Sequence, residues 1–159
     1  MLKAAFPGSF DPPTLGHLNI IKRAAAIFDE LMVVVAENRL KKYLFSAEER
    51  VFMLRELVSD LKNVSIAVCD ILIVDFLRKN EMNLLVRGLR GVDDFSYEFE
   101  LSMMNKALDS RIETIFLTCD PEYFILRSSA IKEVASFGGN VSGMVPPLVA
   151  DELRKKYQS

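Results

Sequence analysis

Residues 8–17 read Gly8-Ser9-Phe10-Asp11-Pro12-Pro13-Thr14-Leu15-Gly16-His17 and lie between a short apolar run, 2–6, and a helix-period run, 18–28. This order predicts a strand, a tight loop rich in glycine and proline, and the N-terminus of a helix. Such a junction presents unpaired backbone N–H groups and the positive end of a helix dipole, which together suit a phosphate group. His17 is the only histidine of the chain and falls in the first turn of that helix, so any imidazole chemistry must use it.

Short apolar runs alternate with helix-period segments along the whole chain. Strands are predicted at 2–6, 31–36, 64–68, 84–86 and 114–117. Helices are predicted at 18–28, from Ser46 onward, at 72–79, at 92–108, from Ser128 or Ser129 to Gly138-Gly139, and from Pro147 onward. Short buried strands separated by helices predict a parallel sheet that is covered on both faces. We therefore predict an α/β fold over residues 1–159: one domain with a Rossmann-like, doubly wound sheet of five parallel strands and C-terminal helices.

The predicted strand order is 3-2-1-4-5, and the flavodoxin-like order 2-1-3-4-5 is the alternative. In the first order the sheet changes direction between the first and fourth strands, and ligands bind there, beyond the carboxyl ends of the strands. The segments that follow those two strands, 7–17 and 87–90, carry the densest chemistry of the chain. Their content favours the first order.

Three sets of polar side chains would then meet at one edge of the sheet. The loop 8–17 offers a hydroxyl and an imidazole, Lys41 and Lys42 follow the second strand, and Arg87-Gly88-Leu89-Arg90-Gly91 follows the fourth. Arginine suits bidentate recognition of phosphate. Each set alone could equally be a capped turn or a solvated surface. Their convergence favours a polyphosphate ligand.

Composition excludes several other classes of function. A formal net charge of -2 argues against a nucleic-acid-binding surface, which usually needs a basic excess. The N-terminus is not typical of a signal peptide, and no apolar run is long enough to span a bilayer. Cys69 and Cys119 have the spacing of neither a metal site nor a disulfide framework, which indicates a reducing cytosol.

The familiar catalytic signatures are also missing. Neither the dinucleotide fingerprint G-x-G-x-x-G nor the P-loop motif occurs. With a single histidine and no adjacent serine–aspartate partners, triad hydrolysis is disfavoured. The acidic residues of the fourth helix read as a solvated, hydrogen-bonded helix face rather than as a metal cage. They are Asp93, Asp94, Glu98 and Glu100.

Two segments carry a resemblance to known proteins. Gly8–Pro12, followed by Thr14–His17, resembles the nucleotidyltransferase superfamily with its T/H-x-G-H signature. The segment Arg87–Glu98 is more specific. Together with Phe45–Arg50 and Ser128-Ser129, it resembles the bacterial phosphopantetheine adenylyltransferase family over nearly the whole chain.

That resemblance implies transfer of the adenylyl group of ATP to 4′-phosphopantetheine in the cytoplasm, giving dephospho-coenzyme A and pyrophosphate. It implies Mg²⁺ bound through the ATP phosphates, coenzyme A as a feedback inhibitor, and a homohexamer that binds neither nucleic acid nor membrane. The implied catalytic residues are His17, Lys41 and Arg90. The implied phosphopantetheine-binding residues are Ser9, Lys41, Ile73 and Arg87. The implied ATP-binding residues are Ser9, Phe10, His17, Gly88, Leu89, Arg90, Glu98, Tyr123, Phe124, Ile125, Leu126, Arg127, Ser128 and Ser129.

Elementary chemistry agrees with that reaction. The attacking phosphate is already anionic near neutral pH, so positioning and charge stabilisation at the α-phosphoryl group are the main requirements. A homo-oligomer also follows from the fourth helix, 92–108, because a helix that is apolar on two sides is deeply buried or covered by another subunit. Its two apolar stripes are Phe95, Phe99, Met103 and Leu101, Met104, Leu108.

The chain departs from the family pattern at two positions. Arg127 replaces the first of three consecutive hydroxyl residues, and we predict that it makes a modest contact with ATP. Ile71 stands where glycine is common, which bears on the shape of the pantetheine channel. A cytidylyl- or pyridine-nucleotide transferase, a non-catalytic nucleotide sensor and a flavodoxin-like domain remain the alternative interpretations.

Overall fold

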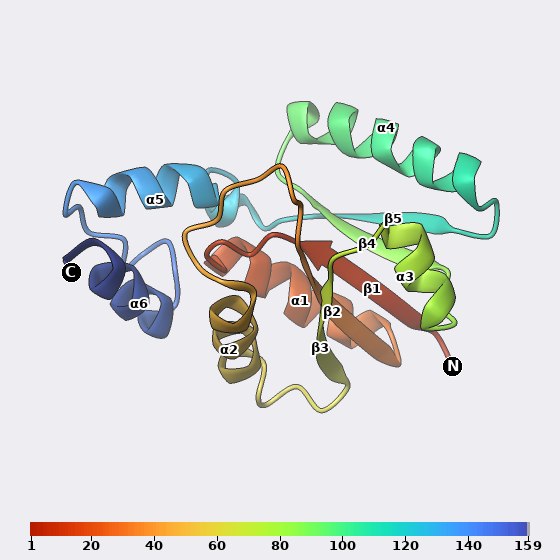
Figure 1. The fold of residues 1–159 in the computed structure, drawn as a ribbon, viewed down its shortest axis with the longest axis horizontal. Helices are drawn as coiled ribbons and strands as arrows, with labels where there is room; N and C mark the ends of the chain where they lie inside the picture. Colours follow the sequence, from red (N-terminus) through yellow and green to blue (C-terminus); the bar gives the residue numbers. More distant parts are fainter. Residues whose placement is uncertain (159) are drawn as a thin grey trace.

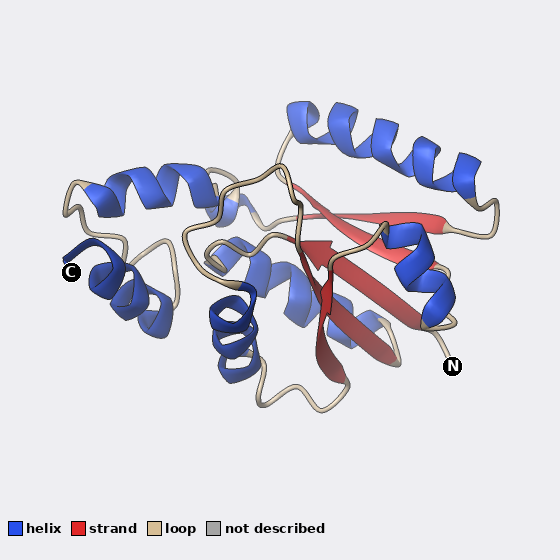
Figure 2. Ribbon diagram, viewed as in Figure 1, coloured by secondary structure: helices blue, strands red, loops and turns tan. Residues whose placement is uncertain are grey.

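The computed structural model describes residues 1–158, in which five parallel strands form one sheet (Figures 1 and 2). The strands are β1 (Lys3–Gly8), β2 (Glu30–Ala36), β3 (Val64–Cys69), β4 (Leu84–Leu89) and β5 (Glu113–Thr118). The α-helices are α1 (Leu15–Ile27), α2 (Ala47–Leu57), α3 (Ile73–Lys79), α4 (Val92–Leu108), α5 (Ser128–Ser136) and α6 (Pro147–Gln158). A short 3₁₀ turn, η1 (Pro121–Tyr123), which the sequence did not predict, precedes α5.

The strand order is β3-β2-β1-β4-β5, which confirms the predicted order and excludes the flavodoxin-like alternative. A helix follows each of the first four strands and carries the chain to the next parallel strand. The order reverses between β1 and β4, so the loop after β1 and the loop after β4 open at the same edge of the sheet.

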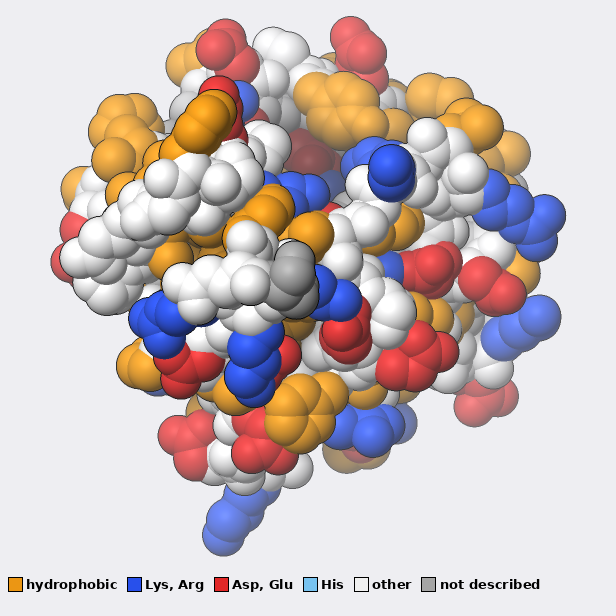
Figure 3. Space-filling view, turned by 60° about the vertical axis from the view of Figure 1, so that its left-hand side comes forward, with side chains coloured by type: hydrophobic (Ala, Val, Ile, Leu, Met, Phe, Trp, Pro, Cys, Tyr) orange, Lys and Arg blue, Asp and Glu red, His pale blue; other side chains and the backbone are white. Residues whose placement is uncertain are grey.

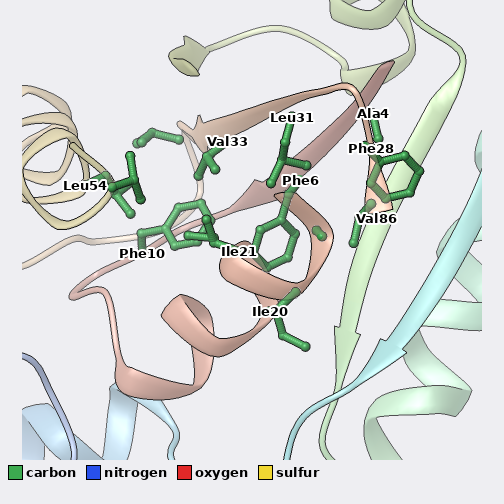
Figure 4. Packing of buried hydrophobic residues seen from close by; sticks show 13 residues of the cluster. Ala4, Phe6, Phe10, Ile20, Ile21, Phe28, Leu31, Val33, Leu54 and Val86 are labelled. Carbon is green, nitrogen blue, oxygen red and sulfur yellow. The ribbon is translucent and has the colours of Figure 1, made fainter. Parts of the chain in front are cut away.

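Helices cover both faces of the sheet. On one face, α1 and α2 pack through a cluster that includes Phe6, Ile21 and Leu54 (Figure 4). On the other face, α3 packs through a second cluster, and α4 lies over β4 and β5. Leu85 and Val86 belong to different clusters because neighbouring residues of a strand point to opposite faces. Each fully buried side chain of this kind contributes about 1.5–3 kcal/mol.

Several strands extend beyond the apolar runs from which the sequence predicted them. β1 continues to Gly8, which pairs with Val35, and β4 continues to Leu89, which pairs with Thr118. Backbone pairing does not require an apolar side chain, so the sheet extends into the segments that carry the chemistry. Glycine and arginine positions that the sequence assigned to loops are therefore held by the ladder of the sheet.

The helix ends agree with the sequence in part. Ser46 and Glu49 form the predicted capping box at the start of α2. At α5 the prediction was wrong: the N-cap is Arg127, no side chain caps the helix, and Ser128 is its first residue. The Ser128 hydroxyl does not cap the helix. It donates to the Pro12 carbonyl oxygen at 2.9 Å.

The C-terminal helices α5 and α6 form a small layer at one end of the sheet (Figure 1) and pack through a third hydrophobic cluster, which also includes Phe45 and Met53. Basic and acidic side chains are interspersed over this end of the molecule (Figure 3). The helix α4 differs from the others, because none of its residues is buried. It contacts the sheet on one side and exposes apolar side chains on the other.

Candidate active site

The loop between β1 and α1 is built around a buried phenylalanine. Phe10 has a φ of 49°, in the left-handed region that bulky residues rarely adopt. Its ring points into the core beside Ile21 (Figure 4) and meets the rings of Phe6 and His17 edge-on, at centroid distances of 5.6 and 4.9 Å. A Cβ at Gly8 would lie 2.9 Å from the tip of that ring, so only glycine leaves room for it. Packing within the protein therefore fixes the shape of the loop.

His17 belongs to the cap of α1. Its backbone N–H donates to Thr14 Oγ1 at 3.2 Å, and the Thr14 backbone N–H donates to His17 Nδ1 at 3.1 Å. This reciprocal pair is a capping box in which an imidazole replaces the usual glutamate or glutamine. Because Nδ1 accepts, the proton of the neutral ring lies on Nε2, which is then a hydrogen-bond donor.

The surroundings of His17 keep its ring uncharged. Burial, reinforced by the positive charges of Arg90 and Arg87, lowers the pKa of His17 from 6.5 to about 4. The imidazole is therefore neutral at physiological pH, and its Nε2–H is a fixed donor rather than an acid. Such a donor can stabilise negative charge as it develops on a reacting group.

A cavity of about 360 Å³, here called the β1–β4 cavity, lies at the edge where the strand order reverses. It is lined by residues from the ends of β1 and β4, from the start of α1 and from the start of α5. The residues that the sequence analysis singled out and that line it are Ser9, Phe10, His17, Arg87, Gly88, Leu89, Arg90, Glu98, Leu126, Arg127, Ser128 and Ser129. The topology thus brings together side chains that are up to 120 residues apart.

A second cavity, of about 560 Å³, lies between the start of α3 and the inner side of α4 and is called the α3–α4 cavity. Ile71 and Ile73 both line it. The two cavities share three wall residues, namely Pro7, Arg87 and Glu98. Two ligands, one in each cavity, would therefore approach each other at Arg87.

Arg87 is held firmly in that wall. Its Nε and Nη2 donate to the two carboxylate oxygens of Glu98, both at 2.6 Å, and its Nη1 donates to the Pro7 carbonyl oxygen at 2.5 Å. Three of its five N–H groups are thus used within the described part of the chain, which leaves two for an anion. The bidentate pair fixes the plane of the guanidinium before any ligand arrives.

Arg90 is fixed in the same way. It pairs with Asp94 at 2.9 Å and donates from Nη1 to the Leu126 carbonyl oxygen at 3.0 Å. Burial acts to raise the pKa of Asp94, but the hydrogen bonds and charge of Arg90 outweigh it and hold that pKa below its usual value. Asp94 therefore remains ionised and keeps the arginine in place. Arg90 in turn ties the segment before α5 to the end of β4.

Four of the sequence-derived site residues line neither the β1–β4 cavity nor the α3–α4 cavity. Lys41 is exposed on the loop between β2 and α2 and lines neither of the two cavities. Phe124 and Ile125 line a neighbouring hollow of about 430 Å³, which they share with Arg90 and Arg127. Tyr123 packs beside α1, because a Cβ added at Gly16 would lie 3.6 Å from the Cβ of Tyr123.

Sequence reasoning missed two buried charged residues behind the site, Asp11 and Arg50. Asp11 was read only as part of a motif, and Arg50 only as part of a resemblance. A signal was present for Arg50, because it precedes Leu54 and Val58 at helical spacing and so lies on the apolar stripe of α2. Their partners come from distant segments, which a local pattern does not reveal.

The charges of the β1–β4 cavity are mainly cationic. Its lining includes Arg87, Arg90 and Arg127, and its one lining carboxylate, Glu98, is engaged by Arg87. Among residues 1–158, no group of three or more histidine, cysteine, aspartate or glutamate side chains is placed to hold a metal ion. The cationic lining therefore suits an anionic ligand.

Comparison with known proteins gives the family. Residues 5–134 match the family model described as cytidylyltransferase-like. The phosphopantetheine adenylyltransferase of Dictyoglomus thermophilum is 51% identical over 157 residues, which cover 99% of this chain and 96% of that relative. The enzyme of the same name from Symbiobacterium thermophilum is 50% identical, with 99% and 97% coverage. The chain belongs to the phosphopantetheine adenylyltransferase family.

Membership of the phosphopantetheine adenylyltransferase family makes the chain a nucleotidyltransferase. The fold agrees, since a solved structure of a putative nicotinate-nucleotide adenylyltransferase from Vibrio parahaemolyticus superimposes with a TM-score of 0.71. That structure is 21% identical and covers 97% of this chain and 99% of its own, so it speaks for the fold alone. In the described part of the chain, no helix has the length and apolarity that crossing a membrane requires.

Proposed function

We propose that this chain transfers the adenylyl group of ATP to 4′-phosphopantetheine and releases dephospho-coenzyme A and pyrophosphate. The observation that carries the proposal is the pair of cavities that meet at Arg87. One has the cationic lining and glycine-rich approach that a triphosphate needs, and the other is larger and lined in part by isoleucine side chains. A two-substrate transfer needs this arrangement, because the reacting groups must meet at one place.

The β1–β4 cavity would take ATP. The neutral His17 would donate its Nε2–H to the α-phosphoryl group as charge develops there, and Ser9 would contact the same region with its hydroxyl. Arg90, just after β4, would bind the phosphates, and the N-terminus of α5 would offer backbone N–H donors and the Ser129 hydroxyl. The adenine would lie toward the hollow beside Phe124 and Ile125.

The α3–α4 cavity would take the pantetheine arm. Its apolar lining, Ile73 included, suits the chain of methylene and amide groups, while the two unused N–H groups of Arg87 suit the terminal phosphate. Lys41 would reach that phosphate only if the loop 37–46 moved inward, because in the structure its side chain is exposed outside both cavities. Its proposed role is therefore to bind phosphate once both substrates are present.

The chemistry needs no general base. An oxygen of the phosphopantetheine phosphate attacks the α-phosphorus of ATP, the bond from that phosphorus to the bridging oxygen breaks, and pyrophosphate leaves with the electron pair. Mg²⁺ bound through the ATP phosphates would neutralise part of the charge on the departing pyrophosphate. The chain itself supplies alignment and fixed donors, which are the main demands of phosphoryl-type transfer.

Pyrophosphate release with a panel of acceptors tests the proposal. The panel would pair ATP or CTP with phosphopantetheine, with pantetheine lacking the phosphate, and with nicotinate mononucleotide. We expect release with ATP and phosphopantetheine only. Equal release with nicotinate mononucleotide would assign the site to another branch of the superfamily, and no release with any pair would leave a nucleotide-binding module.

We further propose a cytoplasmic homohexamer, with coenzyme A, which contains the product, able to compete for the site. Support for assembly comes from the apolar side chains that α4 exposes, which are Val92, Phe95, Tyr97, Phe99, Met103, Met104 and Leu108. Sedimentation of the protein at micromolar concentration tests it, since a monomer is 18.0 kDa. Met104→Glu should dissociate the assembly, whereas Phe137→Glu, at an exposed apolar residue outside α4, should not.

A further inference from the structure

The most deeply buried charge of the molecule belongs to Arg50, whose side chain is 0% exposed. A buried guanidinium must have its N–H groups bonded, and here the acceptors are mainly backbone carbonyl oxygens. Nη1 donates to the Ser9 carbonyl at 2.7 Å, Nε donates to the Phe45 carbonyl at 3.1 Å, and Nη2 pairs with the Glu37 carboxylate. The arginine also stacks on the ring of Tyr43, with Cζ 4.1 Å from the ring centroid.

These acceptors come from three separate places in the chain. Ser9 lies in the loop after β1, Glu37 follows the last residue of β2, and Phe45 lies just before α2. The segment 37–46 joins β2 to α2 and carries Lys41. Arg50 therefore fastens both ends of the lysine-bearing loop to the loop that carries Ser9.

Asp11 makes a second connection between the same loops. Its carboxylate, 4% exposed, accepts the backbone N–H groups of Leu44 and Phe45, both at 2.9 Å. It also pairs with Lys132 of α5 at 2.8 Å. The loop after β1, the lysine-bearing loop and the helix that begins with Ser128 are thus joined through one buried carboxylate.

The two connections flank Phe10, the residue with the left-handed backbone. Arg50 holds the carbonyl of the residue before it, and Asp11 is the residue after it. A bulky residue keeps such a conformation only where its surroundings enforce it. Because the Phe10 ring lies against the His17 ring, the conformation at Phe10 sets the place of the imidazole.

We propose that Arg50 is a positioning residue for adenylyl transfer: through the Ser9 carbonyl it fixes Phe10 and His17, and through Phe45 and Glu37 it holds the lysine-bearing loop in register with them. The inference rests on the reaction proposed above. Arg50 touches neither of the two cavities, so it acts only through the residues that it holds.

The test compares four variants of the full-length protein. Arg50→Met combined with Glu37→Gln removes the guanidinium without leaving its carboxylate partner unpaired, and Glu37→Gln alone is the reference for it because Glu37 lines the α3–α4 cavity. Arg50→Lys keeps the charge but loses the planar fork that reaches several carbonyls at once. Arg55→Met is the matched control, because it removes an exposed arginine from the same helix. For each, kcat and both KM values are measured by pyrophosphate release, and the single histidine is titrated by NMR without substrates.

We expect the double variant to lose about 100-fold in kcat, the effect of a misplacement of about 1 Å, with smaller changes in KM. The pKa of His17 should rise from about 4 toward 6.5 in the same variant, because the ring loses its packed position. Arg50→Lys should show both effects to a smaller degree, and Arg55→Met should show neither. If the double variant does not fold, Arg50→Lys decides alone.

A folded Arg50 variant with wild-type kcat would overturn the inference. So would a reduced kcat with the pKa of His17 unchanged, because the arginine would then not act by placing the imidazole. The histidine titration needs no turnover. It therefore tests the role of Arg50 even if the wild-type protein releases no pyrophosphate, an outcome that would refute the proposed reaction instead.

Discussion

Replacing His17 with glutamine should make the stability of the protein less sensitive to acid. Glutamine at the third position of α1 can still accept the Thr14 N–H, so the capping box at the start of the helix is kept. The substitution removes the only imidazole of the chain. Comparison of the two proteins therefore isolates the titration of one group.

The size of the effect follows from the pKa of His17, which is 6.5 in the unfolded chain and about 4 in the folded protein. Between these values the unfolded chain binds a proton that the folded protein does not, so acid favours unfolding. The loss of stability begins as the pH falls below the unfolded value and is complete below the folded value. From about pH 8 to about pH 5, the free energy of unfolding should fall by about 2 kcal/mol more in the wild type than in the variant.

Denaturant unfolding of both proteins at the two pH values measures that difference, and all other titrating groups cancel in the comparison. The single histidine also gives one set of imidazole NMR signals, from which the pKa and the protonated nitrogen can be read directly. Parallel loss of stability in the two proteins, or a ring that titrates near its unperturbed pKa, would refute the account of a neutral Nε2–H donor.

Three further outcomes follow from the site. His17→Ala should fold but lose about 10²–10³ in kcat at saturating ATP, as for removal of one preorganised donor, and near-normal turnover would contradict the role. Arg87→Ala should raise KM for phosphopantetheine by about 10- to 100-fold and change KM for ATP little, since a charge-assisted contact is lost; steady-state kinetics with each substrate in turn would expose the reverse pattern. Arg127→Ser should weaken ATP binding in calorimetric titrations, more at low salt than at high salt, and an unchanged ATP affinity would make Arg127 a surface residue.

The order of the strands could be predicted because chemistry and topology are linked in this kind of fold. The residues with phosphate-binding character lie at the carboxyl ends of β1 and β4 and in the loops after them, and only one of the two candidate orders makes those strands neighbours. The capping box of Ser46 and Glu49 was equally readable, because both partners lie within one turn. The sequence also placed His17 in the first turn of α1, which the structure confirms, but it did not identify Thr14 as the N-cap.

The burial of Arg50 and Asp11 behind the site could not be predicted from the sequence, for a different reason. A local pattern treats a charged residue as exposed, whereas Arg50 and Asp11 are buried because partners from distant segments compensate their charges. Burial of a charge depends on those partners being present, and the partners are known only once the fold is known. The sequence could place Arg50 on the apolar side of α2, but not the Ser9 carbonyl that it binds.

The acidic residues of α4 fall into two groups. The sequence suggested a solvated face, and Asp93 and Glu100 are indeed exposed. Asp94 and Glu98, one turn apart on the same helix, instead pair with Arg90 and Arg87. The chain thus places two arginines in the β1–β4 cavity without raising its net positive charge, and their carboxylate partners hold both guanidinium groups in place. The two arginines therefore lose less conformational freedom on binding, whereas Lys41 would still have to move toward the site.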